Sequence, residues 1–241
     1  MRWLTNRIKI WIDGAAADAV AKAMPKPEPK VSLPALDILV EKHGYGRTLQ
    51  EKVPVAADGS PIPWYTYPAV EFFGQLDARG LRIFEFGCGN SSLFWAHKGA
   101  EVFAVEHDRA WFEKMSAMSV RLRQLVLRES AADYARAIAD AGDEFDIIII
   151  DGAWRNECAR AALPHLRKGG CIILDNSDWY IDVAEFLRTR EFLQIDFSGF
   201  GPINNYCWTT SLLVPATCVL NAHLNHPRPI GGVEVGKGAT W

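Results

Sequence analysis

The chain has 241 residues, of which 49% are hydrophobic, and it carries a formal net charge of −3 at pH 7. This length suits one α/β domain with additional N-terminal residues, and the slight negative charge gives no general positive field with which to hold nucleic acid. The five cysteines are odd in number and widely spaced, which predicts reduced thiols rather than a disulfide framework or a zinc site. No apolar run is long enough to cross a bilayer and no signal peptide is recognisable, so a cytoplasmic protein is expected.

Residues 1–31 are predicted to form an N-terminal extension with an amphipathic helix and a proline-rich linker. Leu4, Ile8 and Trp11 lie at roughly helical spacing, with basic residues elsewhere in the segment. This helix either docks on its own domain or contacts a membrane surface or a second copy of the chain, and the sequence leaves these alternatives open. The proline repeat over residues 25–30 predicts a stiff, extended linker.

The main domain is expected over residues 32–214, and its first part is mostly irregular. A helix is predicted over 32–43, followed by a loop over 44–61. Residues 62–68 read IPWYTYP, and their aromatic rings either cover a flat ligand or pack as a lid without touching one. A second helix is predicted over 69–76.

From residue 81 onward, predicted strands and helices alternate. The strands cover 82–86, 101–105, 122–128, 145–150 and 171–174, and the helices cover 91–98, 109–119, 134–140, 156–166 and 181–188. Two further strands, over 192–198 and 206–214, have no helix between them and predict an antiparallel hairpin. The expected fold class is therefore α/β, with a doubly wound, mostly parallel seven-stranded sheet that ends in this hairpin. A C-terminal tail over 215–241 follows, and one place considered for it is across the ligand site.

A glycine-rich turn follows the first predicted strand. Residues 82–92 read RIFEFGCGNSS, so an apolar strand breaks at Gly87 and Gly89 and the chain resumes as a helix. Such a turn leaves backbone N–H groups at a helix N-terminus, where the polar end of a nucleotide-like ligand can bind; the alternative is a tight turn that binds nothing. Glu106 closes the second strand at the same edge of the sheet, where it can accept hydrogen bonds from a ribose diol.

These features together resemble the class I S-adenosylmethionine-dependent methyltransferases, over about residues 62–214. The resemblance implies that the turn holds the methionine and ribose portions of S-adenosylmethionine, that Glu106 holds the ribose hydroxyls, and that Asp133 meets the adenine amino group. The cofactor-binding residues that it implies are Glu85, Gly87, Cys88, Gly89, Asn90, Ser91, Glu106, His107, Ser130, Asp133, Tyr134 and Asp151. An NAD-dependent dehydrogenase is the nearest competitor, and it is disfavoured because Ser92 replaces the third glycine of the dinucleotide fingerprint.

A second group of polar residues follows the fourth and fifth strands. Asp151, Asp175 and Asn176 bring oxygen atoms towards one point, and such ligands suit Mg²⁺ or another divalent cation; the alternative is a polar turn without a metal. The trio resembles that of the metal-dependent O-methyltransferases of the catechol type, which implies a metal that binds the acceptor hydroxyl and lowers its pKa. Those enzymes have a basic lysine where this chain has Trp154. Arg155, next to it, is a poor base but a good anion clamp, so the base is not identified.

The sequence therefore predicts an S-adenosylmethionine-dependent methyltransferase that acts on a hydroxyl of a small-molecule acceptor. Asp151, Asp175 and Asn176 are its predicted catalytic and metal-binding residues. Two alternatives stay open: an aminopropyltransferase of the polyamine-synthase type, and a non-catalytic cofactor-binding protein of the same fold. No nucleic acid partner is expected, and oligomerisation is left open.

Overall fold

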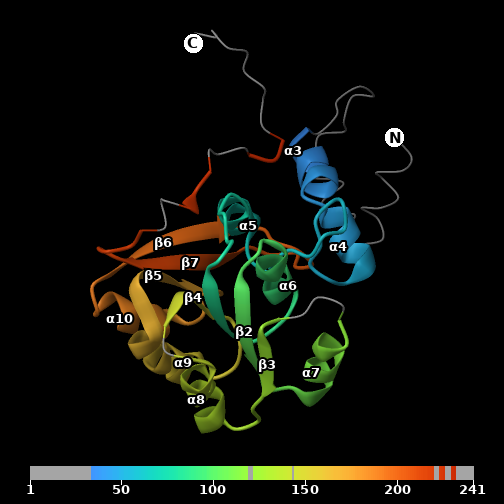
Figure 1. Ribbon diagram of the computed structural model, residues 1–241. Coiled ribbons are helices and arrows are strands. Elements are labelled where there is room, and N and C mark those ends of the chain that lie inside the picture. The colour runs from blue at the N-terminus through green and yellow to red at the C-terminus, as the bar shows by residue number, and fades with distance from the viewer. Residues whose placement is uncertain (1–33, 119–121, 143, 220–222, 226–228, 232–241) are drawn as a thin grey trace, which may run out of the picture. The chain divides into compact units, whose positions relative to one another are not determined.

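The computed structural model describes residues 34–118, 122–142, 144–219, 223–225 and 229–231 (Figure 1). The chain divides into two compact units, Met1–Asp37 and Ile38–Trp241. The described part of the first unit is the short helix α3 (Pro34–Asp37). The amphipathic helix and the linker that the sequence predicts lie outside the described residues.

The second unit is built on one seven-stranded sheet with the order β3-β2-β1-β4-β5-β7-β6. Its strands are β1 (Arg82–Phe86), β2 (Glu101–Glu106), β3 (Gln124–Leu127), β4 (Phe145–Ile150), β5 (Leu166–Leu174), β6 (Phe192–Gly199) and β7 (Trp208–Pro215). The first five strands pair in parallel, whereas β7 lies antiparallel between β5 and β6. The order of winding reverses between β1 and β4, so the predicted doubly wound sheet with a terminal hairpin is confirmed.

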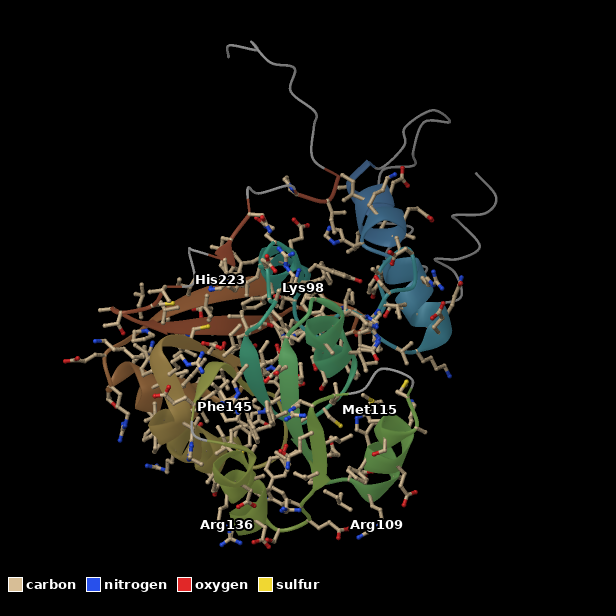
Figure 2. All side chains as sticks on the ribbon, viewed as in Figure 1. Lys98, Arg109, Met115, Arg136, Phe145 and His223 are labelled. Atoms are coloured by element: carbon tan, nitrogen blue, oxygen red, sulfur yellow. The ribbon has the colours of Figure 1, made fainter. Side chains whose placement is uncertain are left out.

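Helices cover both faces of the sheet. They are α5 (Tyr67–Gly74), α6 (Asn90–His97), α7 (Arg109–Ser116), α8 (Ala131–Ala141), α9 (Arg155–Ala162) and α10 (Ile181–Arg188), with a short 3₁₀ turn, η2 (Leu163–His165). Alternate side chains of a strand face opposite sides: Phe84 and Ile148 join the cluster under α8, α9 and α10, while Ile83 and Ile149 join the one under α5 and α6. Figure 2 contrasts the buried Phe145 with Arg109 and Arg136, which point outward.

The segment predicted as a loop before the aromatic cluster contains a helix, so that prediction was wrong. A π-helical turn, η1 (Ile38–Lys42), is followed by Gly44 in a left-handed conformation (φ +76°) and then by α4 (Tyr45–Glu51). The sequence of this helix, YGRTLQE, has no apolar stripe from which a helix could be predicted. It is fixed instead by tertiary contacts: the buried Thr48 donates a hydrogen bond to the Val53 carbonyl, and Gly44 lies against the backbone of Ala56.

Residues 223–225 of the C-terminal tail do not lie across the carboxyl ends of the strands. Leu224 forms an antiparallel bridge with Leu76, and the backbone N–H of Asp77 donates to the His223 carbonyl at 2.8 Å. Residues 75–77 precede β1, so this part of the tail lies towards the amino ends of the strands. The placement considered from the sequence is wrong for residues 223–225. Among the described helices, none combines the length and apolar character that a membrane span requires.

Candidate functional site

The glycine turn after β1 is held in place by the buried carboxyl group of Glu85. Glu85 is 1% exposed and accepts hydrogen bonds from the hydroxyls of Ser91 and Ser92, in the first turn of α6. Burial raises the pKa of Glu85 to about 8, although the two serine hydrogen bonds act in the opposite direction. Glu85 therefore fixes the shape of the turn and does not line the cavities described below. The residues of the turn that line them are Gly87 to Ser91.

The turn also depends on a close approach between two loops. Gly87 has φ +110° and donates its N–H to the Val105 carbonyl at 2.9 Å. Gly152, after β4, lies so near that a Cβ atom on it would be 2.9 Å from the Gly87 nitrogen and 2.0 Å from the Tyr134 hydroxyl. A side chain at residue 152 would push the turn out of place.

Glu106, at the end of β2, keeps only part of its carboxylate available. Its Oε1 accepts from the backbone N–H groups of His107 and Asp108 at 2.7 and 2.8 Å, while Oε2 accepts from the Cys88 thiol at 3.5 Å. Its side chain is 7% exposed, and His107 Nδ1 is 2.9 Å from Oε1. Burial, and then the Glu106 charge, raise the pKa of Cys88, so this thiol is a neutral donor at pH 7. The free bonding capacity of Glu106 is at Oε2.

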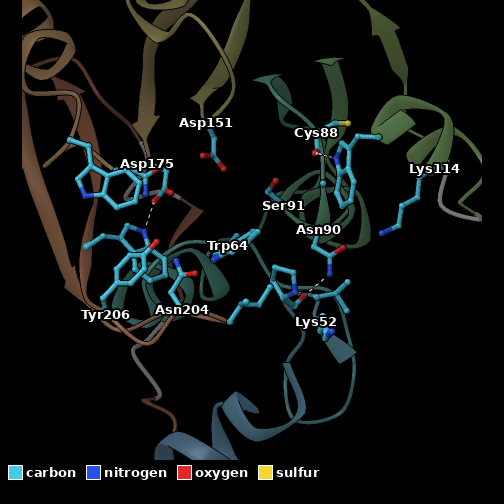
Figure 3. Close-up of a pocket in the computed structure, with 18 residues that line it drawn as sticks. Lys52, Trp64, Cys88, Asn90, Ser91, Lys114, Asp151, Asp175, Asn204 and Tyr206 are labelled. Atoms are coloured by element: carbon cyan, nitrogen blue, oxygen red, sulfur yellow. Dashed lines mark hydrogen bonds between the residues drawn. The ribbon is translucent and has the colours of Figure 1, made fainter. Parts of the chain in front are cut away.

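Two adjoining cavities open at the carboxyl ends of the strands. One, of about 740 Å³, contains Glu106 and His107; the other, of about 540 Å³, contains Asp175 and Asn176. The residues that line both are Cys88, Trp111, Lys114 and Asp151. Of the predicted cofactor residues, the turn from Gly87 to Ser91, Glu106, His107 and Asp151 are thus brought together. Figure 3 places Cys88, Asn90 and Ser91 on one side of the smaller cavity and Asp175 on the other.

Trp111 and Lys114 also line the site and were not predicted from the sequence. Asp108 caps α7 by accepting from the Trp111 backbone N–H at 2.7 Å, and the Trp111 indole N–H donates to the Cys88 carbonyl at 2.7 Å. Lys114 Nζ lies 4.4 Å from the centre of the Trp111 ring. A signal for them was present in the sequence: Asp108, two residues after the strand-end Glu106, is an N-cap acid that starts the next helix at the edge where ligands bind.

Three other predicted cofactor residues line neither cavity. Ser130 caps α8 and, with Arg136, hydrogen-bonds the exposed carboxylate of Asp133. Tyr134 is fully buried in the core, its ring 5.3 Å from that of Trp154. Their part in binding adenine stays a prediction.

A buried guanidinium joins the two acidic strand ends. Arg155 is 7% exposed; its Nη2 lies 3.1 Å from Asp151 Oδ1, Nε donates to the Gly152 carbonyl at 3.0 Å, and Nη1 donates to the Asp175 carbonyl. Its guanidinium also lies 4.4 Å above the Tyr180 ring. The predicted role as an anion clamp is not what this geometry favours, because each guanidinium nitrogen already has a protein oxygen as its partner.

The two carboxyl groups differ in their surroundings. Asp175 is 3% exposed, and its Oδ1 accepts from Thr210 Oγ1 at 2.5 Å and from the Trp208 indole N–H at 3.1 Å. Burial, followed by the charge of Asp151, raises the pKa of Asp175 well above its usual value. Burial also raises the pKa of Asp151, but the Arg155 guanidinium opposes this. Asp175 therefore retains a proton more readily than Asp151.

These residues fit a divalent cation poorly. The described residues contain no group of three His, Cys, Asp or Glu side chains arranged to hold a metal ion. The positive charge beside Asp151 comes from Arg155, and one oxygen of Asp175 is occupied by Trp208 and Thr210. Arg155, Trp208 and Thr210 thus take the places that a metal ion would need beside these two acids.

Aromatic rings from three separate segments line the smaller cavity. Trp64, Trp179 and Tyr206 are 44%, 56% and 45% exposed. The two interpretations of residues 62–68 each apply to part of that segment, because Trp64 faces the cavity whereas Tyr65 and Tyr67 are buried. Tyr206 was predicted as the first residue of the strand 206–214, whereas β7 begins at Trp208 and Tyr206 belongs to the connection between β6 and β7.

Comparison with known proteins identifies the fold. No protein-family model matches the chain, and no curated protein matches it in sequence. A putative caffeoyl-CoA O-methyltransferase from Staphylococcus aureus has 16% identity and a TM-score of 0.52, over 76% of this chain and 99% of that one. A methyltransferase-like protein from Silicibacter pomeroyi (20% identity, 65% and 90% of the two chains, TM-score 0.45) and precorrin 8w decarboxylase from Methanobacterium thermoautotrophicum (15%, 69% and 97%, 0.47) also match. The similarity to the Staphylococcus aureus protein, at 16% identity, shows the fold and not the activity. This chain has the Rossmann-like methyltransferase fold.

Proposed function

We infer that the protein transfers a methyl group from S-adenosylmethionine to a hydroxyl group of a small molecule. The observation that carries this proposal is the pair of adjoining cavities at the switch point between β1 and β4. One presents the Glu106 carboxylate, which suits a ribose diol, and the other presents Asp151 and Asp175 beside aromatic rings. A methyl donor that lies in the first with its sulfonium at the shared residues would face an acceptor in the second. The fold likeness to a putative O-methyltransferase supports the same reaction class.

Lysine side chains favour a cofactor that keeps its carboxylate. Lys52 and Lys114 line the smaller cavity, and neither has a carboxylate partner within 4 Å among the described residues. Lys52 adjoins the segment whose Pro54 carbonyl accepts from Asn90 Nδ2 at 2.5 Å, so it lies beside the glycine turn. A lysine here would pair with the methionine carboxylate. Decarboxylated S-adenosylmethionine lacks that group, which disfavours the aminopropyltransferase alternative.

Asp151 is our candidate for the base. As the new O–CH₃ bond forms and the S–CH₃ bond breaks, the electron pair of the broken bond stays on sulfur and the acceptor proton must leave. Asp151 lies where the two cavities meet, and Arg155 keeps it ionised more readily than Asp175. Its second oxygen, Oδ2, has no partner among the described residues and is free to accept that proton. The sulfonium is a strong electrophile, so positioning and one base are sufficient.

Titration calorimetry tests the proposal. We expect S-adenosylmethionine and S-adenosylhomocysteine to bind with micromolar dissociation constants, and decarboxylated S-adenosylmethionine to bind at least tenfold more weakly. Glu106→Ala should weaken binding of S-adenosylhomocysteine by a factor of about 10–100, from the loss of a charged hydrogen bond. Glu129→Ala, which removes an exposed acid paired with Arg109, is the matched control and should have no effect. Failure of the wild-type protein to bind either of the first two compounds would overturn the proposal.

A further inference from the structure

We propose that the methyl acceptor is a carbohydrate-type ring, neutral and hydroxylated at several carbons, which stacks on Trp179 and Tyr206. This inference rests on the proposed function and names the substrate class of the same site. Three observations on the smaller cavity carry it: the arrangement of its exposed aromatic rings, the number of its unpartnered polar groups, and the sign of the charge at its inner wall.

The aromatic rings form a platform rather than a sandwich. Trp179 and Tyr206 are about half exposed, and their ring centres lie 6.1 Å apart with an interplanar angle of 38°. Tyr206 in turn meets the buried Trp208 at 6.0 Å and 62°. Side-by-side, splayed rings of this kind offer one broad apolar surface. A sugar ring presents an apolar C–H face to such a surface and keeps its hydroxyl groups at the edge.

Unpartnered polar atoms surround this platform. Within the described part of the chain, the second oxygens of Asp151 and Asp175 have no hydrogen-bond partner, and neither do the side-chain amides of Asn176 and Asn204. Figure 3 shows Asp151, Asp175, Asn204 and Tyr206 around one end of the cavity. These groups combine acceptors with amide donors, and a ring hydroxyl can pair with either because it donates one bond and accepts two.

The number of these groups separates a sugar from a phenol. A phenol brings one or two hydroxyls, and each polar group of the cavity that it buries without a partner weakens its binding. A ring with hydroxyls at several carbons pairs with more of them. A site built to hydrogen-bond hydroxyl groups also rejects analogues that lack them.

The charge of the inner wall disfavours acidic acceptors at the reacting end. Asp151 and Asp175 lie there with one guanidinium between them, and its nitrogens already bind protein oxygens. A carboxylate or phosphate placed against Asp151 would meet like charge, and the lysines of this cavity, Lys52 and Lys114, pair with the methionine carboxylate in the proposed function. A neutral polyol avoids this repulsion.

The experiment is ligand-observed saturation-transfer NMR on the full chain loaded with S-adenosylhomocysteine. The probes are methyl glycosides of common hexoses and 6-deoxyhexoses, with catechol and 4-hydroxybenzoate as the phenolic set. We expect at least one glycoside to bind more tightly than both phenols, and Trp179→Ala to weaken that binding about tenfold. Phe200→Ala is the matched control, because Phe200 is also an exposed aromatic residue (46%, against 56% for Trp179) and does not line the cavity.

The outcomes separate this inference from the proposed function. If S-adenosylhomocysteine binds but the phenols bind as well as or better than every glycoside, or no probe binds, the substrate class is overturned and the methyltransferase proposal stands. Glycoside binding that Trp179→Ala leaves unchanged would also overturn it. Absence of S-adenosylhomocysteine binding would overturn both proposals together.

Discussion

The two halves of the site both bury acidic side chains, but they hold them with different groups. In the half formed by β1 and β2, Glu85 and Glu106 are held by serine hydroxyls and backbone N–H groups, which carry no net charge. In the half formed by β4, β5 and β7, the guanidinium of Arg155 pairs with the Asp151 carboxylate and donates to the backbone carbonyl of Asp175. The carboxyl group of Asp175 is held by Thr210 and Trp208. The first half is preorganised by its own local turn, whereas the second also needs one buried cation, which balances Asp151 and links the two loops.

The two halves also differ in backbone conformation. The turn of the first half uses Gly87 for its positive φ of 110°, a conformation that costs glycine little. The second half places Trp154 and Asn176 at φ +48° and +51°, which is unfavourable for a bulky side chain such as Trp154. The surrounding contacts must hold these residues in place, so we expect the second half to be the more sensitive to loss of a single interaction.

The largest predicted effect comes from removing the cation of the second half. Arg155→Met should lower the free energy of unfolding by about 3–5 kcal/mol, because it removes the cation beside the Asp151 carboxylate and the donors to the Gly152 and Asp175 carbonyls. Urea denaturation measures this change. Arg160→Met, on the exposed side of α9, is the control and should cost less than about 1 kcal/mol. An Arg155→Met protein of wild-type stability would contradict the distinction between the two halves.

A pH effect of intermediate size is predicted for the first half. Burial raises the pKa of Glu85 from 4.5 to about 8, so the folded state binds this proton more tightly than the unfolded chain does. The contribution of Glu85 to stability is therefore full below pH 4.5 and is lost as pH rises through about 8, a change on the order of 2–4 kcal/mol. Denaturation at a series of pH values should give a slope in this window that Glu85→Gln reduces and Glu129→Gln does not. An unchanged slope in Glu85→Gln would show that the carboxyl is ionised in the folded protein.

The smallest predicted effects concern the contact between the halves. Gly152→Ala should cost about 1–3 kcal/mol and weaken cofactor binding, because the new methyl group would meet both the Gly87 nitrogen and the Tyr134 hydroxyl. That hydroxyl is buried without a hydrogen-bond partner, so Tyr134→Phe alone should be neutral or stabilising by up to about 1 kcal/mol. Added to Gly152→Ala, it should restore part of the lost stability. Thermal melts and calorimetry of the four proteins measure both quantities, and no rescue in the double variant would contradict the contact.

Features that are fixed by local sequence could be predicted, and features that are fixed by contacts between distant segments could not. The strands, the terminal hairpin, the glycine turn and Glu106 follow from local patterns, and the convergence of Asp151 with Asp175 follows from the order of parallel strands. Arg155 was predicted to clamp an anion. It binds the backbone carbonyls of Gly152 and Asp175 instead, and no residue pattern predicts such contacts. The helix α4 was missed because tertiary contacts fix it. Residues 62–68, which include Trp64, were considered as a cover over a ligand, but their meeting with Trp179 and Tyr206 exists only in the folded chain.

A crystal structure of the protein with S-adenosylhomocysteine tests the central claim most directly. We predict that the ribose hydroxyls lie within hydrogen-bond distance of Glu106 Oε2, and that the sulfur lies near Asp151, where the two cavities meet. A ligand bound elsewhere, or a Glu106 carboxylate turned away from the ribose, would contradict the account.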